Sequence, residues 1–374
     1  MADTEITFTT GAITLHGSLR LPAGSGPDAP APAVLLLAGS GPTDRNGDSA
    51  LLPGSIGTLE FLADLLERHG FASLRYDKLG SGSTGLGPYE LEDIGDLGFS
   101  VFTDAAAAAL TFLSDRAAVD PERVYVVGHS EGALIALALA GSGAKVAGLG
   151  LLEPLAVRLL DLLTTQIDGQ LTAVVGAGQL PVELADELRV ALAGAVESLR
   201  SDATLTDDLP DPLRAAGLVP ANARALAEED ALDPRELASR LPAGLPVVTS
   251  CSAKDIQLSS SDVDALDAAL AHTALTPVRM TTANHVLKEI GDSPSTGADY
   301  IEPFPWSTEF TQVSRAGSAA SDPPFDPGLR RPGDTLTQKP RCRRAVTAVW
   351  FSVNQRHTRE RYGRDAVDEL GKTP

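Results

Sequence analysis

One serine in this chain is placed where its hydroxyl could act as a nucleophile. Ser130 is the centre of Gly128-His129-Ser130-Glu131-Gly132, which follows an apolar run at residues 124–127 and precedes an alanine- and leucine-rich run. This order predicts a strand, a sharp turn and a helix, with Ser130 at the apex. The glycines suit such a turn because, without a Cβ, they let strand and helix approach closely. A serine exposed in this way, beside a suitable base, can attack an acyl carbonyl.

The base that would take the proton from Ser130 has six candidates, since the chain contains six histidines. His285 follows the last predicted strand, at residues 277–281, in a short Asn-His-Val loop. From there its ring can reach the edge of the sheet at which the strands end. The others lie in a hairpin, at helix ends, beside Ser130 or in the C-terminal region: His16, His69, His129, His272 and His357. We therefore select His285 as the general base.

The carboxylate that would orient His285 is predicted to be Asp255. It follows the predicted strand at residues 246–251 after only Ser252-Ala253-Lys254. An aspartate in a turn ordinarily hydrogen-bonds within its own loop, but this one ends the strand before that of His285. Because the carboxyl ends of parallel strands meet at one edge of a sheet, the three residues are expected to converge there. The backbone N–H of Glu131, at the helix start, would face the negative charge that develops during acyl transfer.

The elements around these residues indicate an α/β fold with a mostly parallel, doubly wound sheet. Residues 6–9 and 13–21 alternate with period two around Thr10-Gly11, the pattern of an N-terminal antiparallel hairpin. Further strand patterns at 33–38, 71–77, 124–127 and 146–152 alternate with helical patterns at 59–69 and 99–116. Strands that alternate with helices predict right-handed crossovers and helices on both faces of the sheet.

The pattern changes along the chain and divides it into four segments. Residues 1–154 and 242–316 carry the sheet pattern, whereas residues 155–241 between them show amphipathic helices without a comparable strand. We expect this middle segment to be a helical insertion over the sheet edge. Residues 317–374 are rich in Pro, Gly, Ser and Arg and have little periodicity, which is typical of a poorly ordered extension.

The composition limits the classes of partner. The formal net charge of −20 disfavours nucleic acid and anionic membranes, because it repels phosphate. The basic cluster Arg341-Cys342-Arg343-Arg344 leaves a nucleic-acid-binding tail as a weaker alternative. No apolar run reaches the roughly 20 residues that span a bilayer. The acidic N-terminus lacks the pattern of a signal peptide, so we expect a cytoplasmic protein. Two cysteines, Cys251 and Cys342, indicate neither a disulfide framework nor a metal cluster.

Together these segments resemble the α/β-hydrolase superfamily, in the branch of bacterial esterases, lysophospholipase-like enzymes and serine-aminopeptidase-like proteins. The order Ser, Asp, His along the chain is the one expected of that superfamily. The matching motifs are Leu37-Ala38-Gly39-Ser40-Gly41-Pro42-Thr43-Asp44-Arg45-Asn46-Gly47, Arg75-Tyr76-Asp77-Lys78-Leu79-Gly80-Ser81-Gly82, Gly128-His129-Ser130-Glu131-Gly132, Ala253-Lys254-Asp255-Ile256-Gln257 and Ala283-Asn284-His285-Val286-Leu287-Lys288. They are specific for the fold and the triad, and much less so for the substrate. The segment after residue 316 has no counterpart in the pattern.

The resemblance implies an α/β-hydrolase fold in which residues 155–241 are a helical cap over an acyl- or alcohol-binding pocket. It also implies that the loop after β-strand residues 33–38 supplies a second backbone donor for the oxyanion, and Ser40 is the matching position. Ala38 replaces the family's common histidine, which leaves this backbone donor intact. The implied catalytic set is Ser130, Asp255 and His285, with Ser40 and Glu131 as the oxyanion hole, and it requires neither a metal nor an organic cofactor.

The first functional hypothesis is therefore a serine hydrolase that cleaves carboxylic esters with small to medium acyl chains. An aminopeptidase, thioesterase or acyltransferase with the same triad remains an alternative, and a non-catalytic hydrolase-like binding protein is a weaker one. The side chain of Glu131 either caps its helix or reaches the pocket, and Asp44, Arg45 and Asp77 either line the pocket or stay solvated in their loops. Acyl-chain length, stereochemistry and physiological substrate stay open, and the sequence is compatible with a homodimer.

Overall fold

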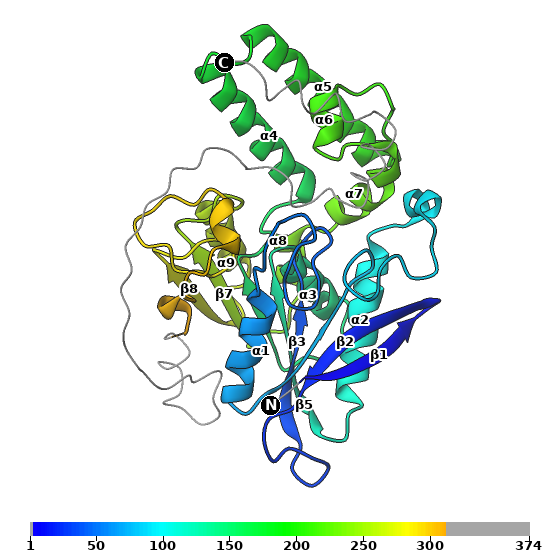
Figure 1. Cartoon of the computed structure of the whole chain (residues 1–374), viewed down its shortest axis with the longest axis vertical. Coiled ribbons are helices and arrows are strands. Elements are labelled where there is room, and N and C mark those ends of the chain that lie inside the picture. The colour runs from blue at the N-terminus through cyan, green and yellow to red at the C-terminus, as the bar shows by residue number, and fades with distance from the viewer. Residues whose placement is uncertain (1–2, 312–374) are drawn as a thin grey trace.

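The computed structural model describes residues 3–311 of the chain. Figure 1 shows a sheet flanked by helices, with a further group of helices at one end of the molecule. The predicted extension at residues 317–374, with its basic cluster and Cys342, lies outside the described residues. Within residues 3–311, no helix has the length and apolar character needed to cross a membrane.

An eight-stranded sheet runs through the molecule in the order β1-β2-β4-β3-β5-β6-β7-β8. Its strands are β1 Thr4–Thr10, β2 Ile13–Arg20, β3 Ala31–Leu37, β4 Ala72–Tyr76, β5 Val119–His129, β6 Gly148–Leu152, β7 Pro246–Ser252 and β8 Ala274–Met280. From β4 to β8 in this order the neighbours pair in parallel, whereas β2 pairs antiparallel with both β1 and β4. The predicted N-terminal hairpin and mostly parallel sheet are confirmed. The carboxyl ends of the parallel strands meet at one edge, where the candidate site residues follow them.

Helices cover both faces of this sheet (Figure 1). One face is covered by α2 (Ser100–Ser114), α3 (Glu131–Gly141), α8 (Pro234–Ser239) and α9 (Ser260–Ala269), and the other by α1 (Thr58–Arg68). Residues of β3 alternate between the two cores: Leu35 and Leu37 belong to the first, Val34 and Leu36 to the second. All four are at most 1 % exposed. A strand buried on both faces has to be apolar throughout, which explains the apolar run in the sequence.

Between β6 and β7, a stretch that is described throughout, the chain forms helices and no strand. The first four helices are α4 Leu159–Gly176, α5 Val182–Asp202, α6 Asp211–Ala215 and α7 Ala223–Asp230, and residues of all four enter one separate apolar core. In Figure 1 they lie together at the top of the view. Short 3-10 helices are also present in the described region: η1 Leu91–Asp96, η2 Pro220–Asn222 and η3 Ala298–Ile301.

A buried carboxylate ties the ends of these helices together. Asp230, whose side chain is 1 % exposed, accepts hydrogen bonds from Arg158 at 2.5 Å and Arg200 at 2.9 Å, and from the backbone N–H of Leu160 at 2.9 Å. The next helix, α8, packs instead on α3 and α9. Its Leu237 belongs to the core on the face of the sheet that α2, α3 and α9 cover. The helical segment therefore returns to the main core before β7 begins.

Candidate active site

Ser130 lies at the sharp turn between β5 and α3 that the glycine spacing predicts. Its backbone has φ 56° and ψ −120°, and a positive φ is uncommon for a residue with a side chain. The turn is so tight that a Cβ on Gly128 would lie 2.0 Å from the carbonyl oxygen of Gly132. Only glycine fits at position 128, and the strained backbone places the Ser130 side chain at the carboxyl end of β5.

The loop after β3 lies directly against this turn. A Cβ on Gly39 would come within 3.3 Å of Ser130 Cβ, and a Cβ on Gly132 would come within 2.4 Å of the Leu37 carbonyl oxygen. The close approach needs glycine at position 132, where the obstacle is backbone. Ser40, the residue after Gly39, lines the same pocket as Ser130.

A buried ion pair joins this loop to the start of α3. Lys78 follows β4 closely, and its Nζ lies 2.5 Å from the Gly39 carbonyl oxygen and 3.0 Å from Glu131 Oε1. The two charged side chains are only 6 % and 5 % exposed. The Lys78 ammonium also lies 5.3 Å from the centre of the Phe102 ring, in a cation–π contact. The Glu131 carboxylate is thus held by Lys78. The sequence suggests that it either caps its helix or reaches the pocket, and the ion pair is neither of these.

His285 and Asp255 form a hydrogen-bonded pair. His285 Nδ1 lies 2.7 Å from Asp255 Oδ2, and the two side chains are 4 % and 0 % exposed. Asp255 Oδ1 accepts from the backbone N–H groups of Gln257 and Leu258. Burial alone would raise the pKa of Asp255, but the facing His285, together with hydrogen bonds, lowers it below its ordinary value. Asp255 is therefore a carboxylate that can orient the imidazole.

His129 supports the loop that carries His285. Its Nε2 donates to the His285 carbonyl oxygen at 2.8 Å, and the centroids of the two rings are 4.8 Å apart. Burial, with the neighbouring His285, lowers the pKa of His129 to about 3, so its ring stays neutral near pH 7. This histidine is a structural neighbour of the candidate base, and its Nε2 is occupied by the His285 carbonyl oxygen.

One pocket brings most of the candidate residues together. Ser40, Ser130 and His285 line it, and Asp255 lies behind His285 outside the lining. The other lining residues are Gly39, Thr43, Gly47, Ser49, Leu52, Ile56, Thr58, Leu59, His129, Gln257, Val286 and Tyr300. The pocket contains about 490 Å³ of space, counted out to its open mouth. None of these residues comes from 155–241. The walls of this pocket come from the loop after β3 with the start of α1, the turn after β5, and the segments after β7 and β8.

Asp44, Arg45 and Asp77 shape loops and do not line this pocket. Arg45 Nη2 lies 2.8 Å from Asp77 Oδ2, and the Arg45 backbone N–H donates to Asp77 Oδ1 at 2.9 Å. Asp44 accepts from the backbone N–H groups of Asn46 and Asp48. The loop interpretation is therefore the better one, although Arg45 and Asp77 are buried and not solvated.

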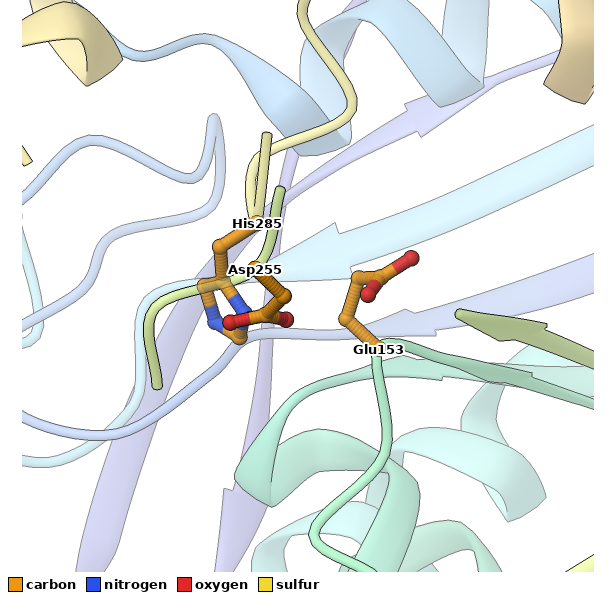
Figure 2. A group of neighbouring side chains, drawn as sticks. All are labelled: Glu153, Asp255 and His285. Carbon is orange, nitrogen blue, oxygen red and sulfur yellow. The ribbon is translucent and has the colours of Figure 1, made fainter. Parts of the chain in front are cut away.

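Glu153 is a neighbour of the histidine–aspartate pair that the sequence patterns do not reveal. It follows β6 directly, and its side chain is fully buried. Figure 2 shows it next to Asp255 and His285. Together the three residues bring potential ligand atoms within 4.8 Å of one another. Because His285 Nδ1 and Asp255 Oδ2 already bond each other, the group fits a hydrogen-bonded chain better than a metal site. The only feature of the sequence that could have indicated Glu153 is its position, as an acidic residue directly after a buried strand.

Comparison with known proteins agrees with this architecture. The profile of a family described as alpha/beta hydrolase fold matches residues 51–181. No curated protein sequence matches the chain significantly. With its eight-stranded sheet, N-terminal hairpin and flanking helices, the chain has the α/β-hydrolase fold. The resemblance inferred from the sequence is confirmed at the level of the fold.

Many solved structures, among them the following three, are similar to the chain at low identity. The α/β-hydrolase GrgF from Penicillium sp. sh18 is 16 % identical, with a TM-score of 0.48 over 76 % of this chain and 91 % of that chain. An esterase from Pyrococcus furiosus is 15 % identical, with a TM-score of 0.46 over 76 % and 83 %. Est1E from Butyrivibrio proteoclasticus, with ferulic acid bound, is 14 % identical, with a TM-score of 0.47 over 75 % and 91 %. Such distant similarity leaves the reaction to be argued from the site.

Proposed function

We propose that this chain is a serine hydrolase that cleaves carboxylic esters with small to medium acyl groups. Ser130 is the nucleophile, His285 the general base and Asp255 the carboxylate that orients it. The observation that carries the proposal is that Ser130 and His285 line one pocket while His285 Nδ1 bonds the buried Asp255 at 2.7 Å. A serine at a strained turn and an oriented imidazole in the same pocket are the groups that acyl transfer requires.

The histidine–aspartate pair sets the direction of proton transfer. Because His285 Nδ1 donates to Asp255, Nε2 accepts the Ser130 proton as Oγ attacks the ester carbonyl. Asp255 stabilises the imidazolium, which then protonates the leaving alcohol. Water activated by the same Nε2 releases the acid from the acyl-enzyme. In both acylation and deacylation, the proton is therefore transferred through His285 Nε2.

Ser40 and Glu131 supply the oxyanion hole through their backbone N–H groups. The Gly39 carbonyl is directed at Lys78, and the C=O and N–H of one trans peptide point in opposite directions. The N–H of Ser40 therefore points away from Lys78. Glu131 begins α3, and first-turn N–H groups are directed out of the N-terminal end of a helix, where negative charge is favoured. Removal of one oxyanion donor typically costs about 3–4 kcal/mol of transition-state stabilisation.

The pocket favours a neutral, apolar group beside the reacting carbonyl. Leu52, Ile56 and Val286 line it next to Tyr300, and the last three of these form a small apolar cluster. Its lining contains no Lys, Arg, Asp or Glu side chain, so an anionic acyl group would find no counter-ion there. The space enclosed away from its open mouth is small, about 40 Å³. These properties favour esters of short, uncharged acids.

We also propose that the helical segment at residues 155–241, apart from α8 at its end, is a cap on a hydrolase core formed by the chain before and after it. The support is the separate apolar core shared by α4 to α7. Since this segment does not line the pocket described above, its proposed role is to limit access to the site. The cap boundary on the C-terminal side is placed before α8, because that helix packs on the main core.

The test is hydrolysis of p-nitrophenyl acetate, butyrate and octanoate by the wild-type protein and by Ser130→Ala. We expect faster turnover of the two short esters than of octanoate. We expect Ser130→Ala to lower kcat by about a thousand-fold or more, since what remains without the nucleophile comes from binding and the oxyanion hole. Turnover by folded Ser130→Ala at the wild-type rate would show that another group performs the reaction.

A further inference from the structure

Both the backbone conformation of Glu153 and the burial of its carboxyl group cost free energy. Its φ is 43°, a value that residues with side chains rarely adopt, and its side chain is fully buried. The Glu153 backbone N–H donates to Ser250 Oγ at 3.1 Å, which anchors the turn after β6 to β7. A glycine would adopt this turn without strain. The presence of a glutamate here therefore points to a use for its side chain.

The Glu153 carboxyl group is held on both of its oxygens. Oε1 accepts from Ser250 Oγ at 3.0 Å, and Oε2 accepts from the backbone N–H of Ser252 at 3.0 Å. Within residues 3–311, no lysine or arginine forms an ion pair with it. Oxygens of the Glu153 and Asp255 carboxyl groups lie within 4.8 Å of each other. Glu153 is thus fixed in place with an acid as its neighbour and without a cation to balance a charge.

Two buried carboxyl groups as close as these hold at least one proton between them, because two buried negative charges at that distance repel strongly. Asp255 faces His285 and two backbone N–H groups, all of which favour its charged form. Burial, reinforced by the charge of Asp255, raises the pKa of Glu153 well above its ordinary value. The proton therefore resides on Glu153.

We propose that Glu153 is a positioning residue for the candidate catalytic pair: it remains uncharged and donates its carboxyl proton to Asp255. This inference rests on the proposed function, since it gives Glu153 a task only if His285 and Asp255 act as base and orienting acid. The hydrogen bond fixes the plane of the Asp255 carboxylate, so that Oδ2 faces His285 Nδ1. The residues Glu153, Asp255 and His285 come from the segments that follow three neighbouring strands, β6, β7 and β8. Figure 2 shows the three side chains together.

Three titratable groups that interact with these residues stay neutral near pH 7. Burial and His285 lower the pKa of His129 to about 3. Burial raises the pKa of the Cys251 thiol, which faces Glu153 and Asp255, to about 11. Burial and the charge of Asp255 raise the pKa of Tyr300. A change in the pH–rate profile of a Glu153 variant therefore reports on Glu153, Asp255 and His285.

The experiment compares the pH dependence of kcat/KM for p-nitrophenyl butyrate in wild type, Glu153→Gln and Glu153→Met. Glutamine is neutral and keeps both an N–H donor and an acceptor, so we expect an acidic limb within about 0.3 pH unit of wild type and a kcat within about threefold. If Glu153 is instead ionised, Glu153→Gln removes a negative charge close to His285. The acidic limb would then move to lower pH by about one unit or more, which would overturn the inference.

Methionine has a similar length and no donor, so Glu153→Met tests the hydrogen bond to Asp255. We expect kcat to fall about 10- to 100-fold with KM nearly unchanged, because only the orientation of Asp255 is loosened. A Glu153→Met protein with wild-type kcat and profile would also overturn the inference. If Glu153→Met fails to fold, the profile of Glu153→Gln decides alone. Full activity of Ser130→Ala would defeat the proposed function, whereas an inactive Ser130→Ala with a displaced Glu153→Gln profile would defeat this inference only.

Discussion

His285 Nδ1 and Asp255 Oδ2 are 2.7 Å apart, and the two residues come from loops after neighbouring parallel strands, β8 and β7. Two backbone N–H groups hold the other carboxylate oxygen. The imidazole is therefore fixed on the side away from the pocket, and its Nε2 is the nitrogen that can exchange a proton with Ser130.

We expect Asp255→Asn to lower kcat by about 10³- to 10⁴-fold with little change in KM. An amide at this position can donate to Nδ1, which selects the wrong tautomer of His285 while the geometry stays intact. The measurement is steady-state hydrolysis of p-nitrophenyl butyrate. Asp230→Asn is the control variant. It makes the same change of Asp to Asn at a buried carboxylate that binds Arg158 and Arg200 outside the candidate site. It should lower Tm and leave kcat of the folded protein near wild type. Wild-type kcat in Asp255→Asn would contradict the assigned role.

Lys78→Met should lower kcat by about 10- to 100-fold, because the Gly39 carbonyl loses the donor that sets the orientation of the Gly39–Ser40 peptide. The variant also removes the Lys78 cation of the buried ion pair with Glu131, which lowers stability. The double variant Lys78→Met/Glu131→Gln also removes the charge of Glu131 and separates the two effects. We expect Tm to recover in the double variant while kcat stays low. Recovery of both quantities would show that Lys78 contributes stability alone.

Gly132→Ala should destabilise the fold strongly, by about 3 kcal/mol or more. A Cβ there would lie 2.4 Å from the Leu37 carbonyl oxygen, so the backbone of β3 or α3 has to move. Gly141→Ala is the matched change at the other end of α3, where the nearest atom is the flexible Leu237 Cδ2 at 3.4 Å. We expect this second variant to be neutral or slightly stabilising. Denaturant unfolding of both proteins gives the comparison, and equal losses of stability would contradict it.

Glu229→Gln should stabilise the protein at pH 8 and have little effect near pH 4.5. Both carboxyl oxygens of Glu229 are buried without a hydrogen-bond partner among the described residues. Burial, with the charges of Glu131 and Asp230 outweighing that of Lys78, raises the pKa of Glu229 well above its ordinary value of 4.5. A carboxyl group whose pKa is higher in the folded state than in the unfolded state favours folding at a pH below the unfolded-state pKa. This contribution to stability is lost as the pH rises toward the folded-state pKa. Glutamine does not titrate, so the difference in Tm between the two proteins should grow to several degrees from pH 4.5 to pH 8. A constant difference would contradict this account.

The sequence predicts elements well where local patterns are strong. The helical pattern at residues 59–69 becomes α1 at Thr58–Arg68, and that at 99–116 becomes α2 at Ser100–Ser114. The strand before Ser130 is longer than its apolar run, since β5 begins at Val119. Residues 120–123 are polar and have the composition of a turn; they bulge out of the strand between Val119, which pairs with Ala31, and Val124, which pairs with Ala33, so the register with β3 shifts there. Composition alone cannot show such a shift, because it depends on the partner strand.

The chain order of Ser130, Asp255 and His285 also indicates which residues come together, because parallel strands present their carboxyl ends at one edge. The contacts of Lys78 and Glu153 could not be predicted in this way. Lys78 reaches Gly39 and Glu131, 39 and 53 residues away, and Glu153 reaches Ser250, 97 residues away. Periodicity reports which face of an element is buried, and it contains no information on which buried polar groups pair across the fold.

The most direct test of the proposed nucleophile is labelling with a fluorophosphonate probe, followed by mass spectrometry of the peptides. The serine that attacks phosphorus must be activated by a base and reachable from the pocket. We predict one adduct, on the peptide that contains Ser130, and at least a hundred-fold slower labelling in folded His285→Ala. An unlabelled folded protein, or an adduct on another serine, would contradict the assignment of Ser130 as the nucleophile.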